Sequence, residues 1–158
     1  MRCDGALVFE RPELNALRDV WQTFAAADRL PRRSDFGARV LKPFLRNIMI
    51  VEREFTGPAQ WRYKMRLEGT AMVEMIGEST GKYLDECYAP EFLPRLIAPY
   101  DAVLEQRVPM RVVVELKTPR LDYLTAESLI APLANARGET AFALRCTYFR
   151  PKVAANEA

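Results

Sequence analysis

The sequence contains no histidine among its 158 residues. That absence excludes Ser-His-Asp and Cys-His catalysis, zinc bound by histidine, haem with a proximal histidine, and a phospho-accepting histidine kinase module. Cysteine is scarce as well. Cys3, Cys87 and Cys146 are an odd number with no short mutual spacing. The sequence therefore predicts neither a disulfide framework nor a zinc site, and it is typical of a reducing compartment.

Long apolar runs and strong net charge are also missing. No stretch approaches the ~18 consecutive apolar residues of a membrane-spanning helix. The first ten residues carry Arg2, Asp4 and Glu10 instead of the apolar core of a signal peptide. A formal net charge of +2 gives no reason to expect nucleic acid or an anionic membrane as a partner. With 49% hydrophobic and 28% charged residues, the chain is expected to form a single globular domain. The cysteine pattern and the lack of a signal peptide or membrane-spanning run predict a cytoplasmic protein.

The first helical signal begins at Pro12, because proline is well tolerated in the first turn of a helix. Four apolar residues at helical spacing then predict an amphipathic helix over residues 12–28: Leu14, Leu17, Trp21 and Phe24. This stripe suits a seam for a homodimer or protein partner, and it equally suits a face that docks on the chain's own sheet. The residues alone leave both uses open.

Alternation of apolar and polar residues predicts the strands. Residues 48–51 form a short apolar run that predicts a strand to about Phe55, and residues 61–68 alternate with period two, so we expect the two strands to pair as a hairpin. Three more strands are expected over residues 110–116, 123–134 and 140–149, the last two joined by a hairpin loop. Two blocks of strands around a helical segment predict an α+β fold with an antiparallel sheet.

Helices are expected between these two blocks of strands. A short one starts at Gly69 and Thr70, with Thr70 as its cap. A longer one follows the strongest helical stripe of the chain, residues 92–104. Pro99 lies within that stripe and predicts a kink or a break.

Several blocks of this sequence together resemble a known family. The densest is Tyr63-Lys-Met-Arg-Leu-Glu-Gly-Thr70, and the others are Leu30-Pro-Arg-Arg-Ser-Asp-Phe36, Leu41-Lys-Pro-Phe-Leu45, Val73-Glu-Met-Ile-Gly77 and Thr80-Gly-Lys-Tyr-Leu84. Over residues 12–150 the chain resembles a bacterial PAS-domain subfamily that is common in alphaproteobacteria and was once filed as a domain of unknown function. It departs from that pattern at Met65, where tyrosine is expected, and between Gly77 and Thr80, where an aspartate and one further residue are often present.

The resemblance implies a PAS-like five-stranded antiparallel sheet with flanking helices and a cavity between them. On that basis we divide the chain into an N-terminal helix and connecting segment (1–46), a PAS-like domain (47–150) and a disordered tail (151–158). The resemblance also implies a small stand-alone bacterial protein that senses a signal or binds a partner. It names no cofactor, because no haem or flavin motif is present and no cysteine lies in an Asn-Cys-Arg helix start.

A cavity of this kind would take a small ligand of apolar or mixed polarity. Its walls would come mainly from apolar residues, with methionines that adapt to irregular shapes, and its polar contacts from Arg66 or Thr70. The predicted pocket residues are Met65, Arg66, Leu67, Thr70, Met72, Met75, Ile76, Leu93, Leu96, Ile97 and Leu144. The same set also suits an ordinary core, and Gly69 with Thr70 suits an ordinary turn and cap.

Catalytic and nucleic-acid signals are weak. The paired carboxylates, Asp85 with Glu86 and Asp101 with Glu105, are typical of surface charge and not of a shared acid–base cleft. The basic residues gathered in residues 29–53 lack a recognition helix and indicate a solvated loop with ion pairs. We therefore predict a non-enzymatic sensory or regulatory module that acts through a small ligand, a protein partner or both.

Two other functions stay open at this point. One is a small enzyme on a cone-like α+β scaffold of the steroid-isomerase kind, in which Tyr63 and Tyr148 would share a cavity. The other is a ligand-free structural dimer or adaptor. The size of the cavity separates the adaptor from the sensor, because a cavity of several hundred Å³ favours a ligand.

Overall fold

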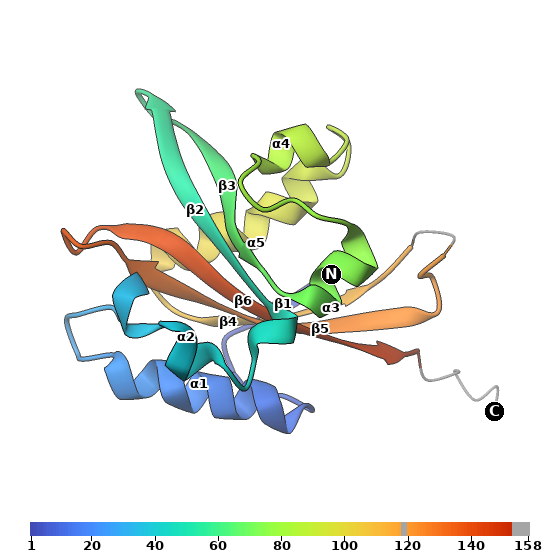
Figure 1. The fold of residues 1–158 in the computed structure, drawn as a ribbon, viewed down its shortest axis with the longest axis horizontal. Helices are drawn as coiled ribbons and strands as arrows, with labels where there is room; N and C mark the ends of the chain where they lie inside the picture. Colours follow the sequence, from blue (N-terminus) through green and yellow to red (C-terminus); the bar gives the residue numbers. More distant parts are fainter. Residues whose placement is uncertain (118–119, 153–158) are drawn as a thin grey trace.

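The computed structural model describes residues 1–117 and 120–152. One antiparallel sheet carries helices on both faces (Figure 1), and its strand order is β1-β4-β5-β6-β2-β3. The strands are β1 (Arg2–Asp4), β2 (Ile48–Gly57), β3 (Gln60–Glu68), β4 (Met110–Glu115), β5 (Leu124–Ala134) and β6 (Thr140–Pro151). The helices are α1 (Pro12–Phe24), α2 (Ala38–Leu41), α3 (Thr70–Ile76), α4 (Leu84–Cys87) and α5 (Leu93–Gln106), with 3-10 turns η1 (Arg33–Asp35) and η2 (Leu45–Asn47).

The predicted α+β architecture is confirmed, with one strand more than the five expected. The extra strand is β1, which pairs with residues 111–113 at the outer edge of β4. Three residues are too few to display an alternating pattern, so this strand could not be predicted from the sequence. The hairpin of β2 with β3 and the hairpin of β5 with β6 lie where the alternation predicted them.

Two apolar cores lie on opposite faces of the sheet. The α1-side core is formed by α1, the segment from Leu30 to Phe44 and one face of β2, β5 and β6. The α5-side core is formed by the opposite face together with residues of α3, α4 and α5. All of β5 is buried, because both of its faces are covered. Successive residues alternate between the two cores, with Leu129 on the α1 side and Ile130 on the α5 side.

Helix α1 ends at Phe24 and is four residues shorter than predicted. Its apolar stripe packs against the chain's own sheet, since Leu14 and Leu17 are fully buried and the Trp21 indole N–H donates to the carbonyl of Pro132 at 3.0 Å. Phe24 packs edge-on against Phe36. Of the two uses that the sequence left open, docking on the sheet is the one observed here. A partner would reach these side chains only if α1 left the sheet.

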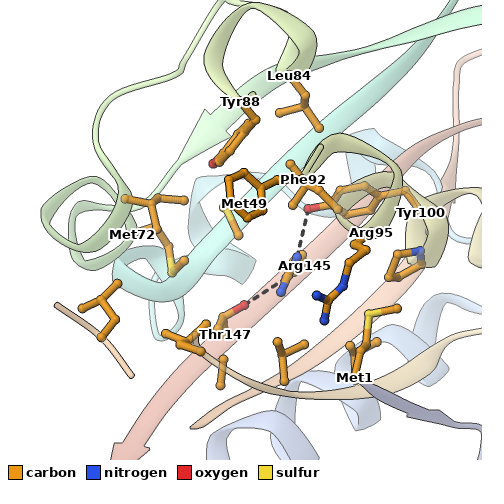
Figure 2. A pocket seen from close by; sticks show the side chains of 18 of the residues that line it. Met1, Met49, Met72, Leu84, Tyr88, Phe92, Arg95, Tyr100, Arg145 and Thr147 are labelled. Atoms are coloured by element: carbon orange, nitrogen blue, oxygen red, sulfur yellow. Dashed lines mark hydrogen bonds between the residues drawn. The ribbon is translucent and has the colours of Figure 1, made fainter. Parts of the chain in front are cut away.

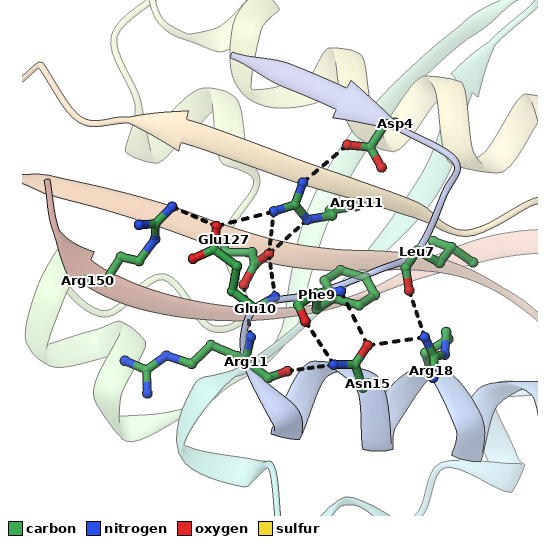
Figure 3. A network of polar contacts seen from close by, with 10 residues as sticks. All are labelled: Asp4, Leu7, Phe9, Glu10, Arg11, Asn15, Arg18, Arg111, Glu127 and Arg150. Atoms are coloured by element: carbon green, nitrogen blue, oxygen red, sulfur yellow. Dashed lines mark hydrogen bonds and ion pairs between the residues drawn. The ribbon is translucent and has the colours of Figure 1, made fainter. Parts of the chain in front are cut away.

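A buried polar network holds the segment between β1 and α1 against the sheet (Figure 3). At its centre is Glu127 of β5, which is 1% exposed. The Glu127 carboxylate accepts hydrogen bonds from the backbone N–H groups of Glu10 at 3.1 Å and Arg11 at 3.3 Å. It also accepts from Nε of Arg111 at 2.8 Å, and Arg111 in turn pairs with Asp4 at 3.3 Å. The network therefore joins residues 4–11 to the middle of the sheet.

Gly69 allows β3 to turn tightly into α3. A Cβ placed on Gly69 would lie 2.1 Å from the carbonyl oxygen of Leu45, so a side chain has no room beside the η2 turn. The Gly69 N–H also donates to the carbonyl of Ile48 at 2.8 Å. Gly69 itself is the N-cap of α3 and makes no side-chain bond, so the prediction that Thr70 caps this helix is wrong. Thr70 is the first helical residue, and its side chain is exposed.

Of the kink or break predicted at Pro99, the break is not observed, since α5 runs unbroken from Leu93 to Gln106 with Pro99 buried inside it. The kink stays a prediction. The boundary predicted at residue 46 does not separate two cores, because Leu17 shares the α1-side core with Ile48 and Leu144. The division of the chain into two folding units at residue 46 therefore stays a prediction.

Strand β6 includes Pro151, the first residue of the predicted tail, and residues 153–158 lie outside the described part of the chain.

Candidate ligand-binding site

A cavity of about 410 Å³ lies between the sheet and the helices of the α5-side core (Figure 2). Its volume falls within the range of roughly 300–1,000 Å³ that is usual for small-molecule sites. Most of its wall is apolar and includes Met49, Met65, Met72, Leu84, Phe92, Leu96, Val112, Val114, Ala126 and Phe149. The cavity thus meets the size criterion that separates a ligand-binding domain from a plain adaptor.

Arg145 is the charged side chain that the central strands place against this apolar wall. Arg145 of β6 stands opposite Met49 and Ile130, whose side chains belong to the α5-side core, so its guanidinium enters the cavity. Nε donates to the Thr147 hydroxyl at 3.1 Å, and Nη2 donates to the Ser128 hydroxyl at 3.2 Å. Within the described residues, Arg145 forms no ion pair with a carboxylate.

Other polar groups line the same cavity. Nη1 of Arg145 donates to the Tyr100 hydroxyl at 3.4 Å. Burial raises the pKa of Tyr88 to about 12, so this phenol stays protonated at neutral pH and can donate a hydrogen bond. Arg95 of α5 points toward the cavity beside Arg145 (Figure 2). Lys117 and Glu115 complete the charged lining, so three cations face one carboxylate.

The sequence matches the model of the PAS domain family over residues 9–147. The chain belongs to the PAS domain family. The family match begins before α1, so the N-terminal helix is part of the matched region. Domains of this family are sensory modules in signalling, and the predicted class of function, a sensory or regulatory module, is confirmed at this level.

A solved structure supports the same fold. A light-oxygen-voltage domain studied with a flavin analogue superposes with a TM-score of 0.51 at 16% identity, over 75% of this chain and 89% of that one. An RNA-binding light-oxygen-voltage receptor gives a TM-score of 0.46 at 11% identity, over 78% of this chain and 35% of that one. No curated protein matches the chain. The PAS sheet expected from the resemblance corresponds to strands β3-β2-β6-β5-β4, with β1 added at its edge.

Four of the predicted pocket residues line the cavity of this PAS domain: Met65, Met72, Ile76 and Leu96. They come from β3, α3 and α5, the elements that the sequence placed around the pocket. Leu93 and Ile97 pack against the α5-side core without lining the cavity. Met75 and Thr70 of α3 also lie outside the lining.

Arg66 and Leu67 do not reach the cavity because β3 is irregular at this point. The register shifts where Ile50 opposes Leu67 and Val51 opposes Met65, so one extra residue of β3 is accommodated there. As a result Leu67 packs against the α1-side core and Met65 against the α5-side core, although strict alternation would put both on one face. Arg66 is directed elsewhere and pairs with Glu52 and Glu54 of β2.

Leu144 lies on the wrong face of β6 for a cavity residue. It is fully buried in the α1-side core together with Cys146. The cavity face of β6 carries the intervening residues Arg145, Thr147 and Phe149. Sequence reasoning missed these three because the apolar alternation of β6 marks the α1-side face. The central position of β6 was the available signal, since both faces of a central strand are covered and its polar residues then face an interior site.

The residues considered for catalysis do not share a site. Tyr63 packs in the α5-side core, whereas Tyr148 packs against the α1-side core on the opposite face. The Tyr63 hydroxyl donates to Asp101 at 2.6 Å, and burial with this carboxylate raises the pKa of Tyr63. Asp85 pairs with Arg62 at 2.7 Å at the surface. Tyr63, Asp101 and Asp85 are therefore held in structural contacts.

The described residues show neither a metal cluster nor a membrane span. No group of three cysteine, aspartate or glutamate side chains in residues 1–117 and 120–152 is placed to hold a metal ion. None of the helices in those residues is long and apolar enough to cross a bilayer. Cys3 and Cys87 are exposed, and Cys146 is buried away from the cavity in the α1-side core.

Proposed function

We propose that this PAS domain is a sensory module that binds a small ligand in the cavity of the α5-side core and is not an enzyme. The observation that carries the proposal is a cavity of about 410 Å³ with a mostly apolar wall and a cationic side chain, Arg145, inside it. A well-formed apolar cavity with a few convergent polar groups is the usual form of a small-molecule site. The expected setting is the bacterial cytoplasm.

The signal would pass by non-covalent association. A ligand changes association only if it binds one arrangement of the protein more tightly than another. Helix α1 is the element we expect to change. Glu127 of β5 holds the start of α1, and the next residue of β5, Ser128, contacts Arg145 in the cavity. Release of α1 would free Leu14, Leu17, Trp21 and Phe24 for a second copy or another partner, which keeps the predicted homodimer within this proposal.

The cavity lining fits some ligands better than others. The described lining contains no cysteine, asparagine or glutamine. A cysteine adduct to a flavin therefore has no residue to form it, and the polar edge of a flavin ring has no side-chain amide to bind. A mainly apolar ligand with one polar end fits the lining better, because the polar groups gather around Arg145.

Native mass spectrometry of the freshly purified chain tests the proposal. We expect a non-covalent adduct that disappears when the same sample is denatured. The matched control is Ala126→Phe, which fills the cavity from a residue that is 3% exposed, while Ala136→Phe adds the same side chain on the exposed hairpin loop. Loss of the adduct in Ala126→Phe alone would support the cavity. An adduct retained by both variants would place the ligand elsewhere and refute the proposal.

A further inference from the structure

The guanidinium of Arg145 keeps its charge inside a largely apolar cavity. Arginine does not lose its proton in proteins, so burial cannot neutralise this side chain. Its partners are the hydroxyls of Thr147, Ser128 and Tyr100, which are neutral and only orient it. A charge held among apolar groups is unfavourable unless an opposite charge compensates it. The cavity therefore has a place for an anion.

Arg111 shows how this same sheet treats a buried arginine that has a structural role. Arg111 lies on the opposite face, where its Nη2 is 2.7 Å from Glu127 and its Nη1 is 3.3 Å from Asp4. Its charge is compensated within the chain. Arg145 lacks such a carboxylate among the described residues, although its side chain is partly buried and lies against the apolar wall of the cavity. The compensating group for Arg145 is thus expected to come from outside the chain.

The hydrogen bonds of Arg145 also indicate the shape of the anion. A guanidinium has five N–H groups. The N–H group on Nε and one N–H group on each of Nη1 and Nη2 donate to the three hydroxyls. One further N–H group on Nη1 and one on Nη2 are left for another partner. Two adjacent N–H groups match the two oxygens of a carboxylate. The Tyr100 hydroxyl accepts from Arg145 and keeps its own hydrogen for donation to the same anion.

The rest of the lining indicates the body of the ligand. Met49, Met65 and Met72 are flexible apolar side chains that adapt to an unbranched chain or a ring. At about 30 Å³ for each non-hydrogen atom, the volume of a liquid water molecule, the cavity holds roughly a dozen such atoms. Arg95 and Lys117 outweigh Glu115 in the lining, so the local field attracts an anion.

From these contacts we infer that the cavity binds an amphipathic monocarboxylate of about a dozen non-hydrogen atoms, with its carboxylate on Arg145 and its apolar body among the methionines. The inference rests on the proposed function, since it names the ligand class of the same cavity. Decanoate has this size and charge and serves as the probe. The neutral 1-decanol has the same body without the charge.

Isothermal titration calorimetry of the full chain with both probes tests the inference. We expect decanoate to bind at least about tenfold more tightly than 1-decanol, because hydrogen bonds between charged groups are the stronger kind. Arg145→Met should weaken decanoate binding about 10- to 100-fold and leave 1-decanol binding unchanged. Arg145→Lys keeps the charge without the fork and should fall between the two. Arg137→Met, on the exposed hairpin loop, should bind both probes as the wild type does.

The possible failures of the two claims differ. Equal binding of decanoate and 1-decanol, or unchanged decanoate binding by Arg145→Met, would overturn the carboxylate inference and leave the ligand-binding function standing. Absence of binding for both probes, together with a native mass free of any adduct, would overturn the proposed function itself. Arg145→Lys retains a cation of similar length, so it keeps the inference testable if Arg145→Met does not fold.

Discussion

Replacement of Glu127 by glutamine should destabilise the fold and loosen α1. Glutamine preserves the shape of the side chain but removes the charge that faces Arg111 at 2.7 Å. Breaking a buried ion pair from one side costs about 3–5 kcal/mol. The lower end applies here, because Arg111 keeps Asp4 at 3.3 Å. Glu127 accepts hydrogen bonds from Arg111 and from the backbone N–H groups of Glu10 and Arg11. The NH2 group of glutamine would face one of these N–H donors, and that hydrogen bond would be lost.

The expected loss is measurable in two ways. A fall of about 3 kcal/mol in the free energy of unfolding lowers Tm by about 6–12 °C in a chain of this length. Hydrogen exchange should increase most in residues 9–24, which the network holds to the sheet. Glu105→Gln is the matched control, because Glu105 lies exposed on α5 and its loss should cost less than about 0.5 kcal/mol. A Tm for Glu127→Gln within 2 °C of the wild type would refute the role assigned to the network.

Three further predictions concern other parts of the fold. Gly69→Ala should cost about 1–3 kcal/mol in chemical denaturation, since its Cβ would meet backbone at 2.1 Å, and a loss below about 0.5 kcal/mol would contradict that close approach. Burial raises the pKa of Cys146 to about 12, so at pH 8 roughly one thiol in 10,000 is ionised, and a thiol reagent should label only the two exposed cysteines until the protein is denatured. Rapid labelling of all three thiols in the native protein would contradict this burial. Arg111→Met should lower the free energy of unfolding by about 3 kcal/mol, whereas Arg145→Met should change it by less than about 1 kcal/mol, and equal losses would show that Arg145 has a structural role.

Local patterns in the sequence predicted most of the elements. The α1 stripe at Leu14, Leu17 and Trp21 identified the helix and its buried face, because helical spacing reports which residues share a side. The same stripe did not say what covers it. That answer depends on Leu129, Leu133 and other sheet residues more than 100 positions away, which no local period can report.

The faces of the strands were harder to predict than their positions. A single irregularity near Arg66 moves Leu67 to the α1-side core, and nothing in the alternation of residues 61–68 marks it. In β6 the apolar residues, Leu144 among them, mark one face clearly, but the sequence does not say which core that face joins. Arg145, the residue on which the site depends, was missed for this reason. Met65 and Met72 were predicted to line the pocket because the apolar residues of their elements mark one covered face, and both residues lie in the α5-side core.

Methionine-methyl NMR tests the central claim, that this cavity is the ligand site, most directly. Met1, Met49, Met65 and Met72 line the cavity, while Met75 and Met110 lie outside its lining and serve as internal controls. With decanoate or 1-decanol added to the full chain, we expect saturable shifts of the four lining methyl signals and little change in the two controls. Shifts confined to Met75 and Met110, or none with either probe, would contradict the claim.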